Sequence, residues 1–350
     1  MSFAGYDFQS VDLKDRQEVE QVRSFLARFD LDYDAAEVEY TLAVFMGETI
    51  TGTGSYRGET LRNIAVSESM QGEGITAAIA TWLMKEQNRR GIFHHFIYTK
   101  PDTVRFFASL GFKEIARVDG LAALLETGLG SVRGYCLDLQ AQTESLAKGN
   151  RAAMVVNCNP FTLGHKALIT QASEENDAVI VIVVSEERSL FPFRHRMDMI
   201  QKGVADLGNV AVVPGGKYVI SQATFPAYFT RGEAAIRAQT RLDVTLFANH
   251  IAPALSVNRR YVGEEPYCAV TDEYNKAMLE ILPPQGIEVK VITRVKSGED
   301  IVSASKVRDQ IRAGNWDEVR RLVPQTTYDT LLSEEFKPVL ETIRSSQSRH

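Results

Sequence analysis

The spacing of apolar and polar positions divides the chain into two stretches of different character. In the first stretch, apolar residues recur at helical spacing in the segments 12–29, 75–88 and 103–110. Strand-like alternation appears in the segments 39–46, 50–56, 60–66 and 96–99. Since it mixes strands and helices, this half of the chain predicts a mixed α/β domain.

The second stretch alternates strands with helices in a more regular order. Strands are predicted over 152–157, 178–185, 209–214, 243–249 and 286–295. Helical patterns lie between them, over 165–175 and 193–207. Such alternation is typical of a parallel, doubly wound, Rossmann-like sheet, and this α/β fold is expected for the second half.

A polar segment over 141–150 separates the two halves. It lacks strong apolar periodicity and contains Gly149 and Asn150, which favour turns and loops. A chain of 350 residues also exceeds the usual size of one domain, which is roughly 150 residues. The expected organisation is a first domain over 1–140, a linker over 141–150, a second domain over 151–325, and a C-terminal helix and tail over 326–350.

Composition and charge narrow the classes of function. Apolar residues make up 44% and charged residues 24% of the chain, as in ordinary globular proteins. A net charge of -6 without any run of Lys or Arg argues against binding to nucleic acid. The three cysteines are far apart and form no CxxC pair, as in proteins of a reducing compartment. No segment has the roughly 18 apolar residues of a membrane span, and no secretory signal is apparent, so a cytoplasmic protein without membrane association is expected.

The segment 157–166 has the character of a phosphate-binding loop. It follows a predicted strand and leads directly into a helix, whose N-terminus offers N–H groups and a positive dipole end to an anion. Gly164 allows a ligand to approach the backbone closely, and Thr162 and His165 can donate hydrogen bonds to an α-phosphate. Lys166 adds a positive charge. A helix cap with a solvated imidazole is the simpler alternative.

A second segment near the C-terminus places hydroxyl groups and cations at another helix start. Ser303, Ser305, Lys306 and Arg308 precede or begin an amphipathic helix over 309–313. Alone, the segment is also typical of a serine N-cap followed by a charged first turn. Together with the first segment it favours one site for a polyphosphate, in which the second segment holds the β- and γ-phosphates.

The two segments resemble the HxGH and ISSxxxR signatures of the nucleotidylyltransferase superfamily. Thr162 stands at the first histidine of HxGH, and Ala304 stands at the second serine of the other signature. The resemblance implies that Thr162 and His165 contact the α-phosphate of ATP, with Lys166 as a further catalytic residue. It also implies that Ser303 and its neighbours clamp the departing pyrophosphate.

The segment 260–275 is similar to the RxVGEEPxCxVTxxYN stretch of citrate lyase ligases, and the runs NPFTLGH and SASKVR also match that family. The resemblance implies that ATP, Mg2+ and acetate give an acetyl-adenylate, and that the acetyl group then passes to the thiol of the acyl carrier (gamma) subunit of citrate lyase. The implied ATP-binding residues are Asn157, Asn159, Pro160, Phe161, Gly164, Arg196, Gly263, Glu264, Ser303, Ser305, Lys306 and Arg308.

The first half resembles the GNAT acyltransferases at two places. The segment 71–76 follows a strand and fits their Q/R-x-x-G-x-G/A loop, except that Thr76 replaces the last small residue. The run VRFFASLGF over 104–112 is similar to their FYxxxGF element. The resemblance implies a GNAT-like fold, in which Gln71, Gly72, Gly74 and Thr76 bind the prosthetic group of the carrier.

Two other functions stay open at this point. One is an adenylyltransferase that makes CoA or a dinucleotide cofactor and carries an appended acyltransferase domain. The other is a catalytically silent regulator that binds an acyl carrier. For the acetyl-adenylate route, Cys158 and Cys268 are expected to be small packing residues without a covalent role.

Overall fold

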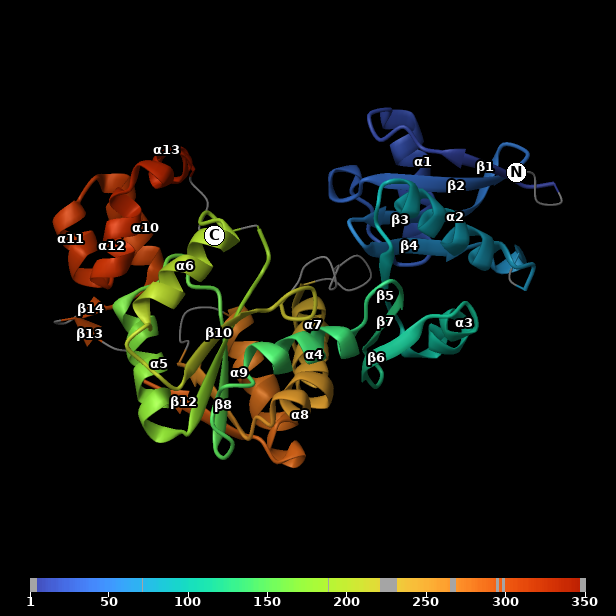
Figure 1. The fold of residues 1–350 in the computed structure, drawn as a ribbon. Helices are drawn as coiled ribbons and strands as arrows, with labels where there is room; N and C mark the ends of the chain where they lie inside the picture. Colours follow the sequence, from blue (N-terminus) through green and yellow to red (C-terminus); the bar gives the residue numbers. More distant parts are fainter. Residues whose placement is uncertain are drawn as a thin grey trace. The chain divides into compact units, whose positions relative to one another are not determined.

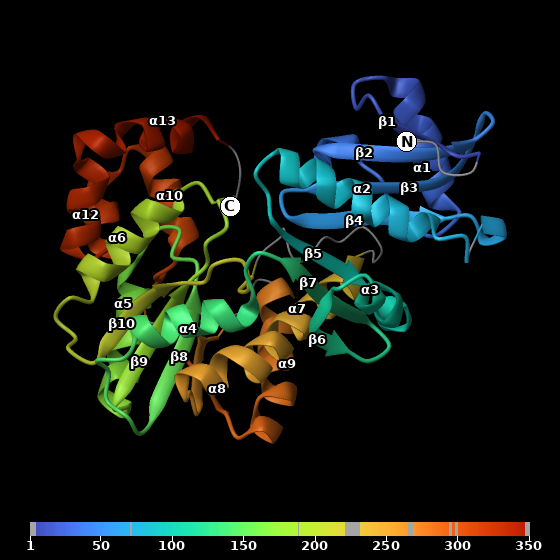
Figure 2. The same cartoon turned by 45° about the vertical axis from the view of Figure 1, so that its right-hand side comes forward.

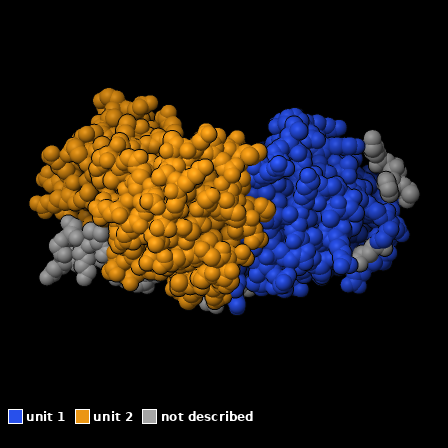
Figure 3. Space-filling view, turned by 60° about the horizontal axis from the view of Figure 1, so that its bottom comes forward, with its two compact units in different colours: residues 1–134, 222–246 blue, residues 135–221, 247–350 orange. Residues whose placement is uncertain are grey.

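The computed structural model describes residues 5–70, 72–187, 189–220, 232–264, 269–293, 296–297 and 300–346. The chain forms two compact units, which Figure 3 colours separately. Unit 1 takes in residues 1–134 and 222–246, and unit 2 takes in residues 135–221 and 247–350. Unit 1 therefore includes a segment from the second half of the sequence.

Unit 1 is built on a seven-stranded sheet of order β1-β2-β3-β4-β5-β7-β6. Its strands are β1 (Asp7–Ser10), β2 (Tyr40–Met46), β3 (Thr49–Arg57), β4 (Thr60–Val66), β5 (His94–Thr99), β6 (Lys113–Val118) and β7 (Ala122–Gly128). All neighbouring strands are antiparallel except β4 and β5, which pair in parallel only at Thr60 with Phe96 and at Leu61 with Ile97. These two strands consequently separate toward their carboxyl ends.

The helices of unit 1 bury separate cores. On α1 (Arg16–Ala27), apolar residues at helical spacing pack with Ala43 and Ala65 of the sheet. On α2 (Ile75–Arg89) and α3 (Val104–Ser109), they pack with Leu42 and Leu61 in a second core. Gly54 allows α2 to lie close to β3, because a Cβ atom there would be 2.4 Å from the side chain of Ile79. The predicted mixed α/β fold is confirmed for this unit (Figure 1).

Unit 2 contains a five-stranded sheet in which every neighbouring pair is parallel. Its strands are β8 (Arg151–Val156), β9 (Ala178–Val183), β10 (Val210–Pro214), β11 (Arg259–Gly263) and β12 (Glu288–Ile292), in the order β10-β9-β8-β11-β12. Every residue of β9 is buried, which explains its unbroken apolar run. From β8, the chain adds β9 and then β10 on one side of the sheet. It then returns to the other side of β8, where it adds β11 and then β12. The switch point therefore lies between β8 and β11, where ligands bind in open α/β sheets.

Helices cover this sheet as expected for a doubly wound fold (Figures 1 and 2). On one face, α5 (Leu163–Glu175) and α6 (Phe193–Gly203) share a core with the C-terminal helices α10 (Ala304–Ala313), α11 (Trp316–Leu322), α12 (Gln325–Leu332) and α13 (Lys337–Ser345). Right-handed crossovers place α9 (Ala269–Ile281), which joins β11 to β12, on the opposite face. The helices α4 (Val132–Gln142) and α8 (Ala252–Leu255) complete the unit. Within the described ranges, no helix has the length and apolarity to cross a membrane.

Short elements connect these helices and strands. They are η1 (Ala35–Glu37), η2 (Glu68–Met70), η3 (Pro101–Thr103), η5 (Pro283–Gln285), η6 (Glu334–Phe336), and the paired strands β13 (Lys296–Ser297) and β14 (Asp300–Ile301).

One predicted strand, over 243–249, is wrong. This segment forms the end of α7 (Gly232–Leu246), which contacts β6 and β7, and the π-helical turn η4 (Phe247–Ile251). Most of its residues are buried, and a short apolar run buried on several sides shows no helical period. Besides β9, β8 pairs with β11, a strand that was not predicted.

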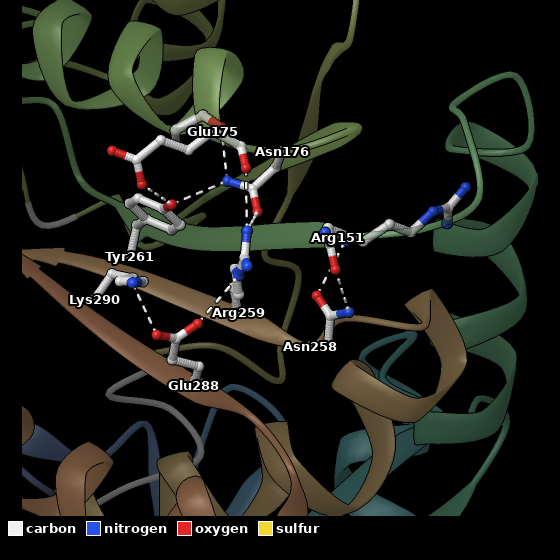
Figure 4. A network of polar contacts seen from close by, with 10 residues as sticks. Arg151, Glu175, Asn176, Asn258, Arg259, Tyr261, Glu288 and Lys290 are labelled. Carbon is white, nitrogen blue, oxygen red and sulfur yellow. Dashed lines mark hydrogen bonds and ion pairs between the residues drawn. The ribbon is translucent and has the colours of Figure 1, made fainter.

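A polar network ties the amino-terminal ends of the parallel strands together (Figure 4). Arg259 at the start of β11 donates to Oδ1 of Asn176 at 2.9 Å and forms an ion pair with Glu288 of β12 at 3.1 Å. Tyr261 donates from its hydroxyl to the carboxylate of Glu175 at 2.6 Å. These contacts join the end of α5 to β11 and β12, at the edge of the sheet opposite the carboxyl ends.

Candidate active site

The start of α5 is fixed by a reciprocal pair of hydrogen bonds. Thr162 is the N-cap, and its Oγ1 accepts the backbone N–H of His165 at 3.4 Å. Nδ1 of His165 in turn accepts the backbone N–H of Thr162 at 3.1 Å. Because a backbone N–H can only donate, this bond assigns the proton of a neutral imidazole to Nε2. The capping geometry therefore orients His165 as a donor through Nε2.

The start of α10 has a similar arrangement. Ser303 is its N-cap, and Oγ of Ser303 accepts the backbone N–H of Lys306 at 3.2 Å. The hydroxyl of Ser305 lies 3.1 Å from the same oxygen. Neither α5 nor α10 has an acidic residue in its first turn, so the positive dipole end of each helix is not offset there.

The structure brings these two helix starts together. A Cβ atom on Gly164 would lie only 3.2 Å from the carbonyl oxygen of Val302, the residue before the cap of α10. Arg308, which is 6% exposed, donates from its guanidinium to the carbonyl oxygen of Asn159 in the loop before α5. Two segments that are far apart in sequence thus place their N–H groups, hydroxyls and cations together in one site.

The loop between β8 and α5 has a constrained backbone. Cys158 adopts a positive φ of 50°, and the peptide bond from Asn159 to Pro160 is cis. Oδ1 of Asn159 accepts the backbone N–H of Phe191 at 3.1 Å. Cys158 is 2% exposed, and burial raises the pKa of its thiol, so a thiolate nucleophile is disfavoured there. The expected packing role of Cys158 agrees with this environment, whereas Cys268 lies outside the described residues.

Phe161 serves this loop as a packing residue. Its side chain is fully buried, and its ring lies against the backbone of Gly203 in α6, where a Cβ atom would be 2.3 Å from the ring. The imidazole of His165 lies near the same ring, with the two ring centroids 6.0 Å apart. A contact of Phe161 with ATP could therefore come only from its backbone.

Arg196 braces two loops beside the site. Its side chain has no exposed surface, and burial lowers the pKa of the guanidinium. It donates to the carbonyl oxygens of Val184 at 2.7 Å and Glu186 at 2.8 Å, which follow β9. It also donates to Phe191 O at 2.9 Å and to the side chain of Asn157 at 2.9 Å. The structure therefore gives Arg196 a structural role in place of an open position for a phosphate.

The two lysines of the predicted site are each paired with a carboxylate. Nζ of Lys166 lies 3.2 Å from Asp206, which follows α6, and this hydrogen bond lowers the pKa of the Asp206 carboxyl. Nζ of Lys306 lies 3.6 Å from Glu318 of α11. Sequence reasoning missed both partners, because neither is close in sequence to its lysine and no motif marks it.

Gly263 and Glu264 lie at the carboxyl end of β11, across the switch point from the end of β8. The backbone N–H of Glu264 donates to Ile292 O at 2.9 Å, and its side chain is exposed. Nδ2 of Asn275 in α9 donates to Gly263 O at 3.5 Å. Residues 265–268 of the same predicted motif lie outside the described residues.

The GNAT-like loop of unit 1 joins β4 to α2. Gly72 and Gly74 both adopt positive φ angles, of 93° and 78°, and Gly74 is the N-cap of α2. Thr76 lies in the first turn of α2, which contains no acidic residue. The carboxylate of Glu73 accepts a hydrogen bond from the hydroxyl of Tyr6. Gln71 lies outside the described residues.

Across the ranges that the structure describes, no group of three or more His, Cys, Asp or Glu side chains is placed to hold a metal ion.

The parallel sheet and the two capped helix starts at its switch point define unit 2 as an α/β domain of the nucleotidyltransferase type. The family model of the citrate lyase ligase C-terminal domain matches residues 151–331. The [citrate [pro-3S]-lyase] ligase of Klebsiella pneumoniae is 34% identical over 325 residues, which cover 91% of this chain and 94% of the relative. The chain belongs to the citrate lyase ligase family, a family of ligases.

Two further similarities concern one half of the chain each. The phosphopantetheine adenylyltransferase of Corynebacterium efficiens is 30% identical over 118 residues, which cover 33% of this chain and 70% of that protein. The solved structure of the ribosomal-protein-S18-alanine N-acetyltransferase from Escherichia coli aligns with 15% identity and a TM-score of 0.31, covering 36% of this chain and 95% of that one.

Proposed function

We propose that the protein activates acetate with ATP as acetyl-adenylate and then transfers the acetyl group to the prosthetic thiol of the citrate lyase acyl carrier. The observation that carries this proposal is the contact between the starts of α5 and α10 at Gly164 and Val302. It creates a site for an extended polyanion, since the first turn of a helix leaves N–H groups without intrahelical partners. Membership of the ligase family supports the choice of ATP as that polyanion.

In the first half-reaction, a carboxylate oxygen of acetate attacks the α-phosphorus of ATP. The bond from this phosphorus to the oxygen that bridges to the β-phosphate breaks, and pyrophosphate leaves with the electron pair. His165 donates from Nε2 to an α-phosphate oxygen, and Thr162 fixes the imidazole for this task. Lys166 adds positive charge at the same helix start. Such donors stabilise the charge that develops in the transition state, and no covalent enzyme intermediate is needed.

The departing pyrophosphate binds at the start of α10. Ser303 and Ser305 present hydroxyls there, and Lys306 supplies a positive charge. Arg308 holds the loop before α5 through the carbonyl of Asn159 and so fixes the distance between the two halves of the site. Asn157 and Gly263 flank the switch point, where the adenosine is expected.

In the second half-reaction, the thiol sulfur of the carrier's prosthetic group attacks the acetyl carbonyl carbon. The carbon–oxygen bond to the phosphate of AMP breaks, AMP leaves, and the thiol proton passes to solvent. The buried Cys158 has no part in this step. Mg2+ enters with ATP as the magnesium nucleotide, since Mg2+ prefers phosphate oxygens and water as ligands.

Unit 1 is proposed to bind the prosthetic arm of the carrier. Support comes from the separation of β4 and β5 beyond Leu61 and Ile97, next to the glycine loop that begins α2. Trimming the N-terminus does not remove this unit cleanly, because residues 222–246 also belong to it. The better test is Gly74→Val, which strains a residue at φ 78°. It should spare adenylate formation and impair transfer to the carrier. Gly58→Val, at φ 51° in another turn, is the matched control.

The function is tested by incubating the protein with ATP, Mg2+, acetate and deacetylated carrier. AMP and acetylated carrier should appear in equal amounts, and omission of acetate should abolish both. AMP without acetylated carrier, or acetylated carrier without AMP, would contradict the proposal. The expected cytoplasmic location remains a prediction.

The similarity to phosphopantetheine adenylyltransferase favours a second candidate function, the adenylylation of a phosphorylated acceptor. This reaction also releases pyrophosphate, but the AMP group stays in the product. Chromatography of the products after incubation with ATP and 4'-phosphopantetheine distinguishes the two functions. Formation of dephospho-CoA in place of free AMP would favour the second.

A further inference from the structure

Lys306 and Glu318 form an ion pair beside the start of α10. The ammonium lies 3.6 Å from the carboxylate, and both side chains are largely shielded from solvent, at 26% and 28% exposure. Gly314, at φ 71°, turns the chain from α10 into α11, which carries Glu318. The two helices pack through the buried side chains of Val307, Ile311, Val319 and Leu322. The packing of α10 against α11 therefore fixes the position of the Glu318 backbone relative to Lys306.

Glu318 has a second cation beside it. Arg321 also lies 3.6 Å from the Glu318 carboxylate, so two cations share one anion. By contrast, the Asp206 partner of Lys166 is 62% exposed, and solvent screens that pair more strongly. Of these two pairs, the Lys306 pair is the more shielded from solvent.

We propose that Glu318 is a positioning residue, which holds the ammonium of Lys306 over the first turn of α10 until the leaving pyrophosphate takes it up. The inference rests on the proposed function. A lysine side chain has several rotatable bonds, so an unheld ammonium samples many positions and is in the reactive position only part of the time. Holding it beforehand favours the transition state, which is where a positioning residue acts.

The test is a double-mutant cycle on acetate-dependent exchange of labelled pyrophosphate into ATP. The proteins are the wild type, Glu318→Gln, Lys306→Ala and the double variant. Glu318→Gln should lower kcat about tenfold and change the KM for ATP less than about twofold. In the Lys306→Ala background the same substitution should have almost no further effect. Glu334→Gln is the matched control, since Glu334 pairs with Lys337 at 2.6 Å in an exposed segment, and it should leave the exchange unchanged.

The outcomes separate this inference from the function on which it rests. Absence of exchange in the wild-type protein would overturn the proposed function, and this inference with it. Exchange in the wild type with an equal effect of Glu318→Gln in both backgrounds would overturn the inference alone. Glu318→Asp keeps the charge and should retain most of the wild-type kcat. If it loses as much as Glu318→Gln, the positioning role is also overturned, even where Glu318→Gln folds poorly.

Discussion

Replacing Arg196 by lysine tests whether this residue braces the loops or binds ATP. The guanidinium reaches acceptors from three nitrogen atoms, at 2.9 Å from Nε, 2.7 Å from Nη1 and 2.8 Å from Nη2. A single ammonium cannot reach all of these carbonyls. A hydrogen bond to a charged group contributes about 1.5–3 kcal/mol to stability. If Arg196→Lys loses two such bonds and the loops relax around the shorter side chain, the free energy of unfolding should fall by about 3 kcal/mol. In a unit of this size, that loss should lower Tm by roughly 6–12 °C.

The assay is thermal unfolding followed by circular dichroism, together with the KM for ATP at 25 °C. Arg194→Lys is the matched control, because Arg194 is exposed on the same helix turn, and its stability should change by less than about 0.5 kcal/mol. A variant Arg196→Lys with unchanged Tm and a KM for ATP raised about tenfold would refute the structural role. It would restore the ATP contact that the sequence suggested.

Four further substitutions test the site and the stability of each unit. Thr162→Val removes the N-cap hydroxyl and should lower the free energy of unfolding by about 1 kcal/mol and kcat by roughly a hundredfold. Thr162→Ser keeps the hydroxyl and should retain the wild-type stability and kcat, as measured by urea unfolding and by kinetics. Gly203→Ala forces a Cβ atom to 2.3 Å from the ring of Phe161 and should cost about 1–3 kcal/mol by urea unfolding. Burial lowers the pKa of the His95 imidazole to about 4, below its value in the unfolded chain. The neutral imidazole therefore favours the folded state at pH 7, and up to about 3 kcal/mol of folding stability is lost as the pH falls from 6.5 to 4. His95→Gln should flatten that part of the pH profile. Arg151→Gln, which loses donors to the carbonyl of Leu146 beyond α4 and to that of Leu255 at the end of α8, should cost about 2–4 kcal/mol in the same assay.

Each of these predictions has a contrary result. Equal activity of Thr162→Val and Thr162→Ser would remove the hydroxyl from the mechanism. Unchanged stability of Gly203→Ala would mean that the Phe161 ring is not fixed against α6. An unaltered pH profile in His95→Gln, or an unaltered unfolding midpoint in Arg151→Gln, would assign the stability to other groups.

Local signals in the sequence located the start of α5 to within two residues, at 165 against 163, whereas the helix expected over 309–313 begins five residues earlier, at Ala304. Thr162 and Ser303 are residues with strong N-cap preference, and the helices begin immediately after them, as a capping rule based on nearby residues predicts. The parallel sheet also followed from local patterns, because β8 and β9 are continuous apolar runs. These features depend on residues close together in sequence.

Several features that depend on distant residues were not predicted. β11 contains two arginines, and Arg260 is accommodated because its guanidinium lies over the ring of Phe247 at 4.8 Å. A strand of this composition is difficult to predict before that partner is known. The family resemblance implied that Arg196 binds ATP, but its acceptors come from loops that only the fold brings together. The pairing of Glu318 with Lys306 also could not be predicted, because the two residues are brought together by the packing of α10 and α11.

Exchange of labelled pyrophosphate into ATP with no carrier present directly tests the formation of acetyl-adenylate at this site. We expect exchange that requires acetate, because acetyl-adenylate forms reversibly before any thiol takes part. We also expect His165→Ala to lose this exchange while remaining folded, since one lost capping contact costs only about 1 kcal/mol. Exchange that proceeds without acetate, or at an undiminished rate in His165→Ala, would show that the site does not activate acetate in this way.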